Sequence, residues 1–316
     1  MLGICVEASH QRGMGHLFRV LNLCETLRER GLPFRIFVNL HEPSQALLRQ
    51  RNLPFDLITF ESGRSDWKAG LIQKYGVKLW IDDRLDTDEA HALQVKDCGI
   101  PRVTFDDRGA GAALADLNVM ALAFDESENL PGRKVLKGPC YLVLNREIGL
   151  YRRVRSRKKN IVVTLGGSDT YGVTIKVVRI LKAAGLHATV IAGPAFEHMK
   201  DLVDLLNDQF VLKQAVPSLI EEFSHHDLAI TGGGITPFEA NASGLPCVVI
   251  ANEEFEVLVA RGLAAMGGAV YAGHHADIDA GLLTGELDIK AMSVAAMRHV
   301  DLGGAGRVVD EIEALL

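Results

Sequence analysis

The stretch Leu228–Glu239 reads LAITGGGITPFE, and it divides into an apolar run, a glycine turn and the start of a helix. The apolar run is typical of a buried strand. Pro237 fits the first turn of a helix, where its missing N–H group costs no hydrogen bond. Three consecutive glycines carry a large cost in conformational entropy, so the turn needs a reason beyond connecting two elements. The stretch therefore predicts an α/β fold with a ligand near the turn.

Two interpretations of the glycine turn are open from the sequence. In the first, free amides and a hydroxyl face a diphosphate; the residues concerned are Gly233, Gly234, Ile235 and Thr236. Glu239, one turn into the helix, then accepts hydrogen bonds from ribose hydroxyls. In the second, Thr236 and Glu239 form only a capping box. The three glycines favour the ligand interpretation.

Strands and helices alternate along the chain on both sides of this stretch. In the first half, apolar runs at 4–6, 34–38, 57–60, 79–81 and 102–105 alternate with amphipathic segments such as 17–30. A second series begins at Asn160 and continues to Ile250, and we expect helical segments from there to Leu316. This alternation predicts parallel, doubly wound sheets.

The length of 316 residues suits two domains. Six of the eight residues in 152–159 are Arg or Lys, and we interpret this run as a linker. A solvated surface run and a phosphate or membrane contact are both open for it. We predict a Rossmann-like N-terminal domain at 1–150 and a Rossmann-like nucleotide-binding domain at 151–316. The two would face a central cleft at the carboxyl ends of their sheets, where open α/β sheets bind ligands.

Composition excludes several classes of protein. Hydrophobic residues make up 48% of the chain and charged residues 23%, which suits two ordinary cores. The net charge of −6 argues against a nucleic-acid-binding surface. No apolar run is long enough to span a bilayer and no secretion signal stands at the start, so we expect a cytoplasmic protein. The five cysteines form no pair with metal-ligand spacing, so we interpret them as buried thiols in a reducing compartment.

A second glycine-rich turn lies between the first strand and the first helix, at Gly13-Met14-Gly15-His16. Gly13 and Gly15 permit positive φ and a close approach of a ligand to the backbone. His16 stands at the helix start, where the helix dipole favours the neutral imidazole, a competent general base. A tight turn with a capping histidine is the alternative.

Other polar residues also follow predicted strands. Gly167 and Ser168 line a phosphate site in one interpretation, whereas Ser168 or Asp169 only caps a helix in the other. The acidic pairs Asp82-Asp83 and Asp106-Asp107 can orient a sugar, polarise His16 or bind a divalent ion. Solvated strand ends that cap helices explain the pairs equally well. One of the glutamates that follow the last strand, at 253, 254 and 256, can accept hydrogen bonds from sugar hydroxyls.

In these landmarks the chain resembles the nucleotide-sugar hydrolases of the pseudaminic acid pathway and the related spore-coat polysaccharide proteins, which belong with the GT-B glycosyltransferases. The resemblance rests on motifs in family order: Glu7-Ala8-Ser9, Gly13-x-Gly15-His16-x-x-Arg19, Ile81-Asp82-Asp83, Phe105-Asp106-Asp107, Gly138-Pro139-x-Tyr141-x-x-Leu144, Gly166-Gly167-Ser168-Asp169, Gly233-Gly234-x-Thr236-x-x-Glu239 and Gly244-Leu245-Pro246. The chain departs from the family at Arg84, at Gly172 and within Glu254-Phe255-Glu256, positions around the sugar and the acceptor.

The resemblance implies a GT-B-like fold and a UDP-sugar as substrate, with no metal and no cofactor. The C-terminal domain would hold UDP, and His16 would activate water at the anomeric carbon to release UDP and a free amino-sugar for surface-glycan biosynthesis. The candidate catalytic residues are His16 and Asp83, and the candidate substrate-binding residues are Gly13, Gly15, Arg19, Asp107, Gly167, Ser168, Gly233, Gly234, Ile235, Thr236, Glu239 and Glu256.

Three further hypotheses compete with hydrolysis. A glycosyltransferase would use the same donor site and pass the sugar to an acceptor. A sugar-nucleotide sensor would bind without turnover. A dinucleotide-dependent oxidoreductase lacks support because Phe18 stands where the Gly-x-Gly-x-x-Gly pattern needs its third glycine. No motif in the sequence indicates an oligomeric state.

Overall fold

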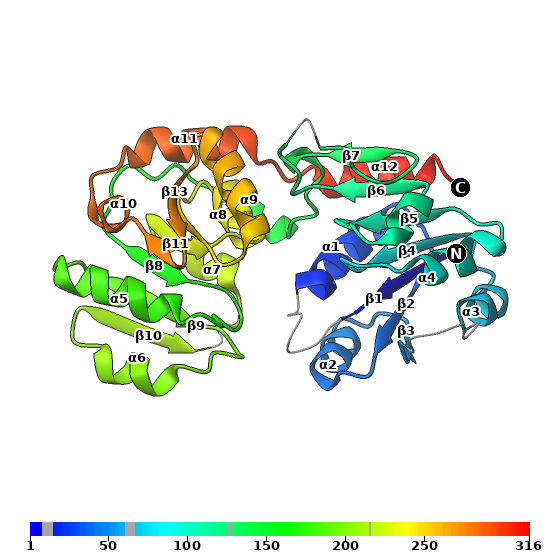
Figure 1. Cartoon of the computed structure of the whole chain (residues 1–316), viewed down its shortest axis with the longest axis horizontal. Coiled ribbons are helices and arrows are strands. Elements are labelled where there is room, and N and C mark those ends of the chain that lie inside the picture. Colours follow the sequence, from blue (N-terminus) through cyan, green and yellow to red (C-terminus); the bar gives the residue numbers. More distant parts are fainter. Residues whose placement is uncertain (8–14, 61–66, 126–127, 215) are drawn as a thin grey trace. The chain divides into compact units, whose positions relative to one another are not determined.

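The computed structural model describes residues 1–7, 15–60, 67–125, 128–214 and 216–316. The chain forms two compact units (Figure 1). Unit 1 comprises Met1–Leu144 together with Gly303–Leu316, and unit 2 comprises Asn145–Leu302. Each unit contains one sheet whose strands are almost all parallel, with helices packed on its faces.

Unit 1 holds the N-terminal elements and the last helix of the chain. They are β1 (Leu2–Val6), α1 (Gly15–Glu29), β2 (Phe34–Asn39), α2 (Glu42–Gln50), β3 (Phe55–Ile58), α3 (Trp67–Tyr75), β4 (Leu79–Asp83), α4 (Glu89–Asp97), β5 (Arg102–Phe105), η1 (Ala110–Leu114), β6 (Leu117–Met120), β7 (Val135–Lys137), η2 (Pro139–Tyr141) and α12 (Gly304–Glu313). The described strands lie in the order β3-β2-β1-β4-β5-β6-β7.

The central strand of unit 1 is buried on both sides. Ile4 packs into a core with Leu21 of α1 and Val308 of α12. Cys5 points to the opposite face, where it belongs to a second core with Trp80. A strand covered on both faces needs apolar residues at successive positions, which is why β1 shows a continuous apolar run in the sequence.

Unit 2 repeats the arrangement. Its elements are η3 (Arg146–Tyr151), β8 (Ile161–Thr164), α5 (Val173–Ala183), β9 (Ala188–Ala192), α6 (Met199–Leu205), β10 (Phe210–Gln214), α7 (Leu219–Phe223), β11 (Leu228–Gly232), α8 (Thr236–Ala242), β12 (Cys247–Ala251), α9 (Glu254–Ala265), β13 (Ala269–His274), β14 (Asp277–Ile278), α10 (Ala280–Thr284) and α11 (Ile289–His299). The order of the described strands is β10-β9-β8-β11-β12-β13-β14, and β14 is antiparallel to β13.

The two sheets share one topology, which confirms the predicted doubly wound α/β fold. In each, the strand order reverses direction between the first strand and the fourth: between β1 and β4 in unit 1, and between β8 and β11 in unit 2. In open α/β sheets, ligands bind beside the carboxyl ends of strands at such a reversal. Both glycine turns singled out in the sequence follow these central strands.

The division of the chain differs from the predicted domains 1–150 and 151–316. The last helix, α12, belongs to unit 1 (Figure 1). It contacts α1, and its residues Asp310 and Glu313 form ion pairs with Arg30 of the neighbouring segment. Its apolar face contributes Val308 and Ile312 to the core beside β1. The sequence pattern shows that this helix is amphipathic, but it does not show which sheet the apolar face covers.

The segment after β12 also differs from the prediction of helical segments alone. Residues 269–274 form β13, which pairs with β12, and residues 277–278 form β14. Only two residues of β13, Ala269 and Ala272, are buried, so this strand is less enclosed than β11 and β12 beside it. Its identity comes from pairing with a neighbour that is distant in the sequence.

The basic run 152–159 is part of unit 2 and does not link the units. Most of its side chains are exposed, but Arg155 is fully buried. The Arg155 guanidinium donates hydrogen bonds to the carbonyl oxygens of Phe223 (3.1 Å), His226 (3.3 Å) and Ser243. Two of these carbonyls lie at the ends of α7 and α8, so one side chain ties two helices together. Burial lowers the pKa of Arg155 to about 10.

We expect Arg155→Met to lower the free energy of unfolding by about 2 to 4 kcal/mol, because it leaves buried carbonyl groups without donors. Arg157→Met, in the same run but exposed, should change it by less than about 0.5 kcal/mol. Urea unfolding followed by circular dichroism measures both values. Equal stability of the two variants would show that Arg155 does not join the helices.

Candidate functional site

In unit 1, polar side chains converge where β4 and β5 end and α1 begins. His16 Nδ1 lies 2.7 Å from Asp83 Oδ1. Arg19, one turn further along α1, binds the same carboxylate in a fork: its Nε donates to Oδ2 at 2.8 Å and its Nη2 donates to Oδ1 at 2.6 Å. The Asp83 side chain is fully buried. The structure thus brings together three of the predicted site residues, His16, Arg19 and Asp83.

The arrangement fixes the protonation of this cluster. Burial alone would raise the pKa of Asp83, but the charge and hydrogen bonds of Arg19, with those of His16, lower it to about 2. An ionised carboxylate only accepts hydrogen bonds, so the neutral His16 ring carries its proton on Nδ1. Nε2 is then the basic atom of the ring. This is the orientation that a general base requires.

Asp106 completes the cluster, although only its neighbour Asp107 was predicted as a substrate-binding residue. The Asp106 carboxylate pairs with Arg19 Nη1, while the Arg19 guanidinium also lies 5.1 Å from the centre of the Phe105 ring. The backbone of Asp106 has a φ of 47°, a left-handed conformation that is uncommon outside glycine. Such conformations cost free energy and collect at functional sites. The motif Phe105-Asp106-Asp107 contained this residue, but adjacency left open which aspartate faces α1.

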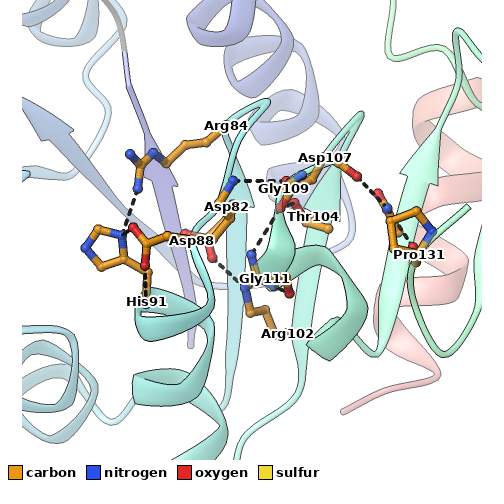
Figure 2. Close-up of polar contacts among 12 residues, drawn as sticks. Asp82, Arg84, Asp88, His91, Arg102, Thr104, Asp107, Gly109, Gly111 and Pro131 are labelled. Carbon is orange, nitrogen blue, oxygen red and sulfur yellow. Dashed lines mark hydrogen bonds and ion pairs between the residues drawn. The ribbon is translucent and has the colours of Figure 1, made fainter. Parts of the chain in front are cut away.

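Asp82 and Asp107 belong to a second network on the other side of the sheet (Figure 2). Arg102 Nε donates to Asp82 at 2.7 Å, and Arg102 Nη2 lies 3.3 Å from Asp107. Lys68 adds a second buried cation beside Asp82, at 3.3 Å. Successive side chains on a strand point to opposite faces, which separates Asp82 from Asp83.

The predicted substrate contact of Asp107 does not fit its surroundings. The side chain is fully buried, and its oxygens accept hydrogen bonds from Thr104 Oγ1 and from the amides of Thr87 and Gly109, each at 3.0 Å (Figure 2). These bonds hold the connections that follow β4 and β5. Asp107 therefore holds these connections in place, whereas the carboxylate of Asp106 pairs with Arg19.

The glycine positions of the first turn are only partly described. Gly13 lies outside the described residues. Gly15 is the first residue of α1, it is exposed, and a Cβ built on it would meet no atom within 4 Å. Packing within the described residues therefore does not explain a glycine at position 15.

In unit 2, the turn Gly232–Ile235 joins β11 to α8 without a capping box. Ile235 is the N-cap residue of α8, and no side chain caps it. Thr236 and Pro237 form the first turn of the helix, so the capping interpretation of Thr236 and Glu239 is wrong. Burial raises the pKa of Glu239 to about 7.

Glu256 lies against this turn. A Cβ at Gly233 would come 2.7 Å from the Glu256 Cβ and 3.1 Å from its Oε2, so only glycine fits there. Asn252 N donates to Glu256 Oε2 at 2.7 Å, and burial raises the pKa of Glu256. The structure thus places the predicted residues Gly233, Gly234 and Glu256 together at the carboxyl end of β11.

In the turn after β8, one residue caps the next helix and two others stay open to a ligand. Asp169 caps α5, because its carboxylate accepts hydrogen bonds from Val173 N at 2.8 Å and Thr174 N at 2.7 Å. Gly167 and Ser168 are exposed and take no part in this cap. They remain candidates for ligand contact.

Two absences apply to the described part of the chain. Among those residues, no three His, Cys, Asp or Glu side chains are grouped so that they could hold a metal ion. Their helices also include none with the length and apolarity needed to cross a membrane.

No protein-family model matches the chain. An uncharacterized protein of Methanocaldococcus jannaschii is 28% identical over 275 residues, which are 81% of this chain and 56% of that protein. The chain thus spans little more than half the length of this relative. The spore coat polysaccharide biosynthesis protein SpsG of Bacillus subtilis is 23% identical over 286 residues, 86% of this chain and 83% of SpsG.

Solved structures show the fold. MurG of Acinetobacter baumannii matches with a TM-score of 0.72 and 16% identity over 99% of both chains. HepE of Anabaena, solved in complex with UDP, matches with a TM-score of 0.71 and 14% identity over the whole of both chains. The fold is GT-B. This confirms the GT-B-like architecture implied by the sequence motifs; identities this low carry no conclusion about activity.

The raised pKa of Glu239 predicts a pH-dependent stability. The folded protein keeps a proton on Glu239 up to about pH 7, whereas the unfolded chain releases it near the ordinary value of 4.5. The free energy of unfolding should therefore fall as the pH rises from about 4.5 to about 7. In Glu239→Gln this fall should be smaller, and the variant should be more stable than wild type at pH 8.

Urea unfolding at a series of pH values tests this prediction. Glu254→Gln, which removes an exposed carboxyl of the same unit, should keep the wild-type slope. If wild type and Glu239→Gln lose stability in parallel between pH 5 and pH 8, the shifted proton does not belong to Glu239.

Proposed function

We propose that this protein is a nucleotide-sugar hydrolase that cleaves a UDP-sugar into UDP and the free sugar, in the biosynthesis of a surface glycan. The observation that supports it most directly is the His16–Asp83 contact of 2.7 Å, held in one orientation by Arg19. A histidine fixed in this way is equipped to take a proton from water near neutral pH.

Unit 2 would bind the nucleotide. The amides of Gly234 and Ile235, with the Thr236 hydroxyl, would contact the diphosphate, whereas Gly233 packs against the Glu256 side chain. Glu239 would accept hydrogen bonds from the ribose hydroxyls. Gly167 and Ser168 are candidates for the opposite wall of the same site. The relative solved with UDP and the SpsG relative support a test with UDP-sugars first.

Unit 1 would supply the base. His16 Nε2 removes a proton from water as the water oxygen attacks the anomeric carbon. The bond between that carbon and the diphosphate oxygen breaks, and its electron pair stays on the departing UDP. Asp83 stabilises the imidazolium that forms, and Arg19 keeps Asp83 ionised. This mechanism uses only groups of the protein and water.

A glycosyltransferase is the second candidate, because the GT-B fold is shared with enzymes that pass a sugar to an acceptor. An acceptor hydroxyl would then take the place of water, and His16 would deprotonate it in the same way. The two candidates differ in whether water alone suffices.

Incubation of the purified protein with UDP-sugars and no acceptor should release free sugar and UDP, measured by chromatography. His16→Ala should lower kcat by about 100-fold or more, because it removes the base, while leaving the Kd for UDP within about 2-fold. His187→Ala, an exposed histidine of unit 2, is the matched control and should keep wild-type activity. Sugar release that strictly requires an acceptor would contradict hydrolysis and support the transferase.

Asp106→Asn should lower kcat by about 10-fold with little change in KM, because Arg19 loses one of its two anchors and holds Asp83 less firmly. Asparagine tolerates the left-handed backbone that Asp106 adopts, so the fold should persist. Asp86→Asn, an exposed aspartate nearby in the sequence, provides the control. Unchanged steady-state rates in Asp106→Asn would remove Asp106 from the positioning of the base.

A further inference from the structure

An aromatic side chain is fixed at the carboxyl end of the unit 2 sheet. Tyr171 lies between β8 and α5, and its ring stacks on the ring of His275 with centroids 3.9 Å apart and planes at 13°. Its hydroxyl donates to Glu253 Oε1 at 3.0 Å. The side chain nevertheless remains 40% exposed. One face of the ring is therefore stacked and its hydroxyl is held, while 40% of the residue stays open to solvent.

The contacts of Tyr171 cross the sheet. Tyr171 follows β8, whereas Glu253 follows β12 and His275 follows β13, and β11 lies between β8 and β12. To reach these partners, the side chain must extend past the carboxyl end of β11, where the glycine turn begins. The connections meet closely there, because a Cβ at Gly232 would lie 3.1 Å from Asn252 Nδ2 and 3.4 Å from Leu165 O.

Unpaired polar atoms gather at the same edge. Thr231 Oγ1, Asn252 Oδ1 and His275 Nδ1 are buried, and none has a hydrogen-bond partner within the described residues. They stand at the ends of β11, β12 and β13 in turn. Buried polar atoms in native proteins are nearly always paired, so three at one edge indicate a polar ligand or ordered water.

We propose that Tyr171, fixed by His275 and Glu253, is the platform on which the base of a nucleoside diphosphate stacks. A planar ring with hydrogen-bonding edges matches both the exposed aromatic face and the unpaired atoms beside it. The proposal rests on the proposed function for the class of ligand. Every base has a π-face, so the platform adds affinity for all of them and the polar atoms at the edge discriminate between bases.

Calorimetric titration of the full-length protein with UDP and with ribose 5-diphosphate, which lacks the base, tests the platform. Wild type should bind UDP about 10- to 100-fold more tightly than ribose 5-diphosphate. In Tyr171→Ala and Tyr171→Leu, the affinity for UDP should fall most of the way to the affinity for ribose 5-diphosphate, which should itself stay unchanged. Tyr171→Phe keeps the ring and should stay within about 3-fold of wild type. The Leu variant keeps apolar bulk, so it serves if the Ala variant fails to fold.

Val203→Ala is the matched control, since Val203 is an exposed apolar residue on α6 in the same unit. It should leave both affinities unchanged. A difference between UDP and ribose 5-diphosphate that persists in Tyr171→Ala, or that disappears in Val203→Ala instead, would overturn the platform and leave the proposed function intact. Equal weakening of both ligands would also overturn it, because Tyr171 would then only support the site. Wild type that binds neither ligand would overturn the proposed function itself.

Discussion

The organisation of unit 1 depends on one buried, ionised carboxylate. Asp83 sits where β4 ends, out of contact with water, and a charge in such a place is tolerated only if it is paired. Arg19 provides the pairing charge from α1, and His16 provides a further hydrogen bond from the same helix. Both contacts come from one face of α1. The orientation of the His16 ring is therefore a consequence of the way the fold pairs Asp83.

The two units use the same topology with different local chemistry. In unit 1, the carboxyl end of the sheet is filled by ion pairs, whose charges compensate one another inside the protein. In unit 2, the corresponding edge holds glycines together with Glu239 and Glu256, whose burial favours the protonated form. In the function proposed above, the first edge would move protons and the second would hold the diphosphate.

The sequence predicted the features that depend on local patterns. Continuous apolar runs mark strands that are buried on both faces, as at Ile4 and Cys5. Runs of glycine mark turns, as at Gly232–Gly234, because a glycine run is unfavourable inside a helix. The sequence does not show which member of an adjacent acidic pair faces α1. Successive side chains of a strand point to opposite faces of the sheet, but the pattern alone does not show which face a helix covers. For this reason the prediction named Asp107 as the binding residue of the pair, whereas Asp106 is the one that pairs with Arg19. Arg155 shows the same limit, since a run of basic residues does not reveal which one is enclosed by carbonyl groups from distant helices.

The position of α12 makes unit 2 an insertion within unit 1. The chain leaves unit 1 after residue 144 and returns to it at residue 303. During synthesis, unit 2 is therefore available to fold as one continuous segment, whereas the core beside β1 stays open until the last helix has left the ribosome. Loss of the final fourteen residues, 303–316, would expose the apolar surface around Leu21 and Ile4, which were made first. The core beside β1 thus depends on a helix that the chain supplies only after the inserted unit.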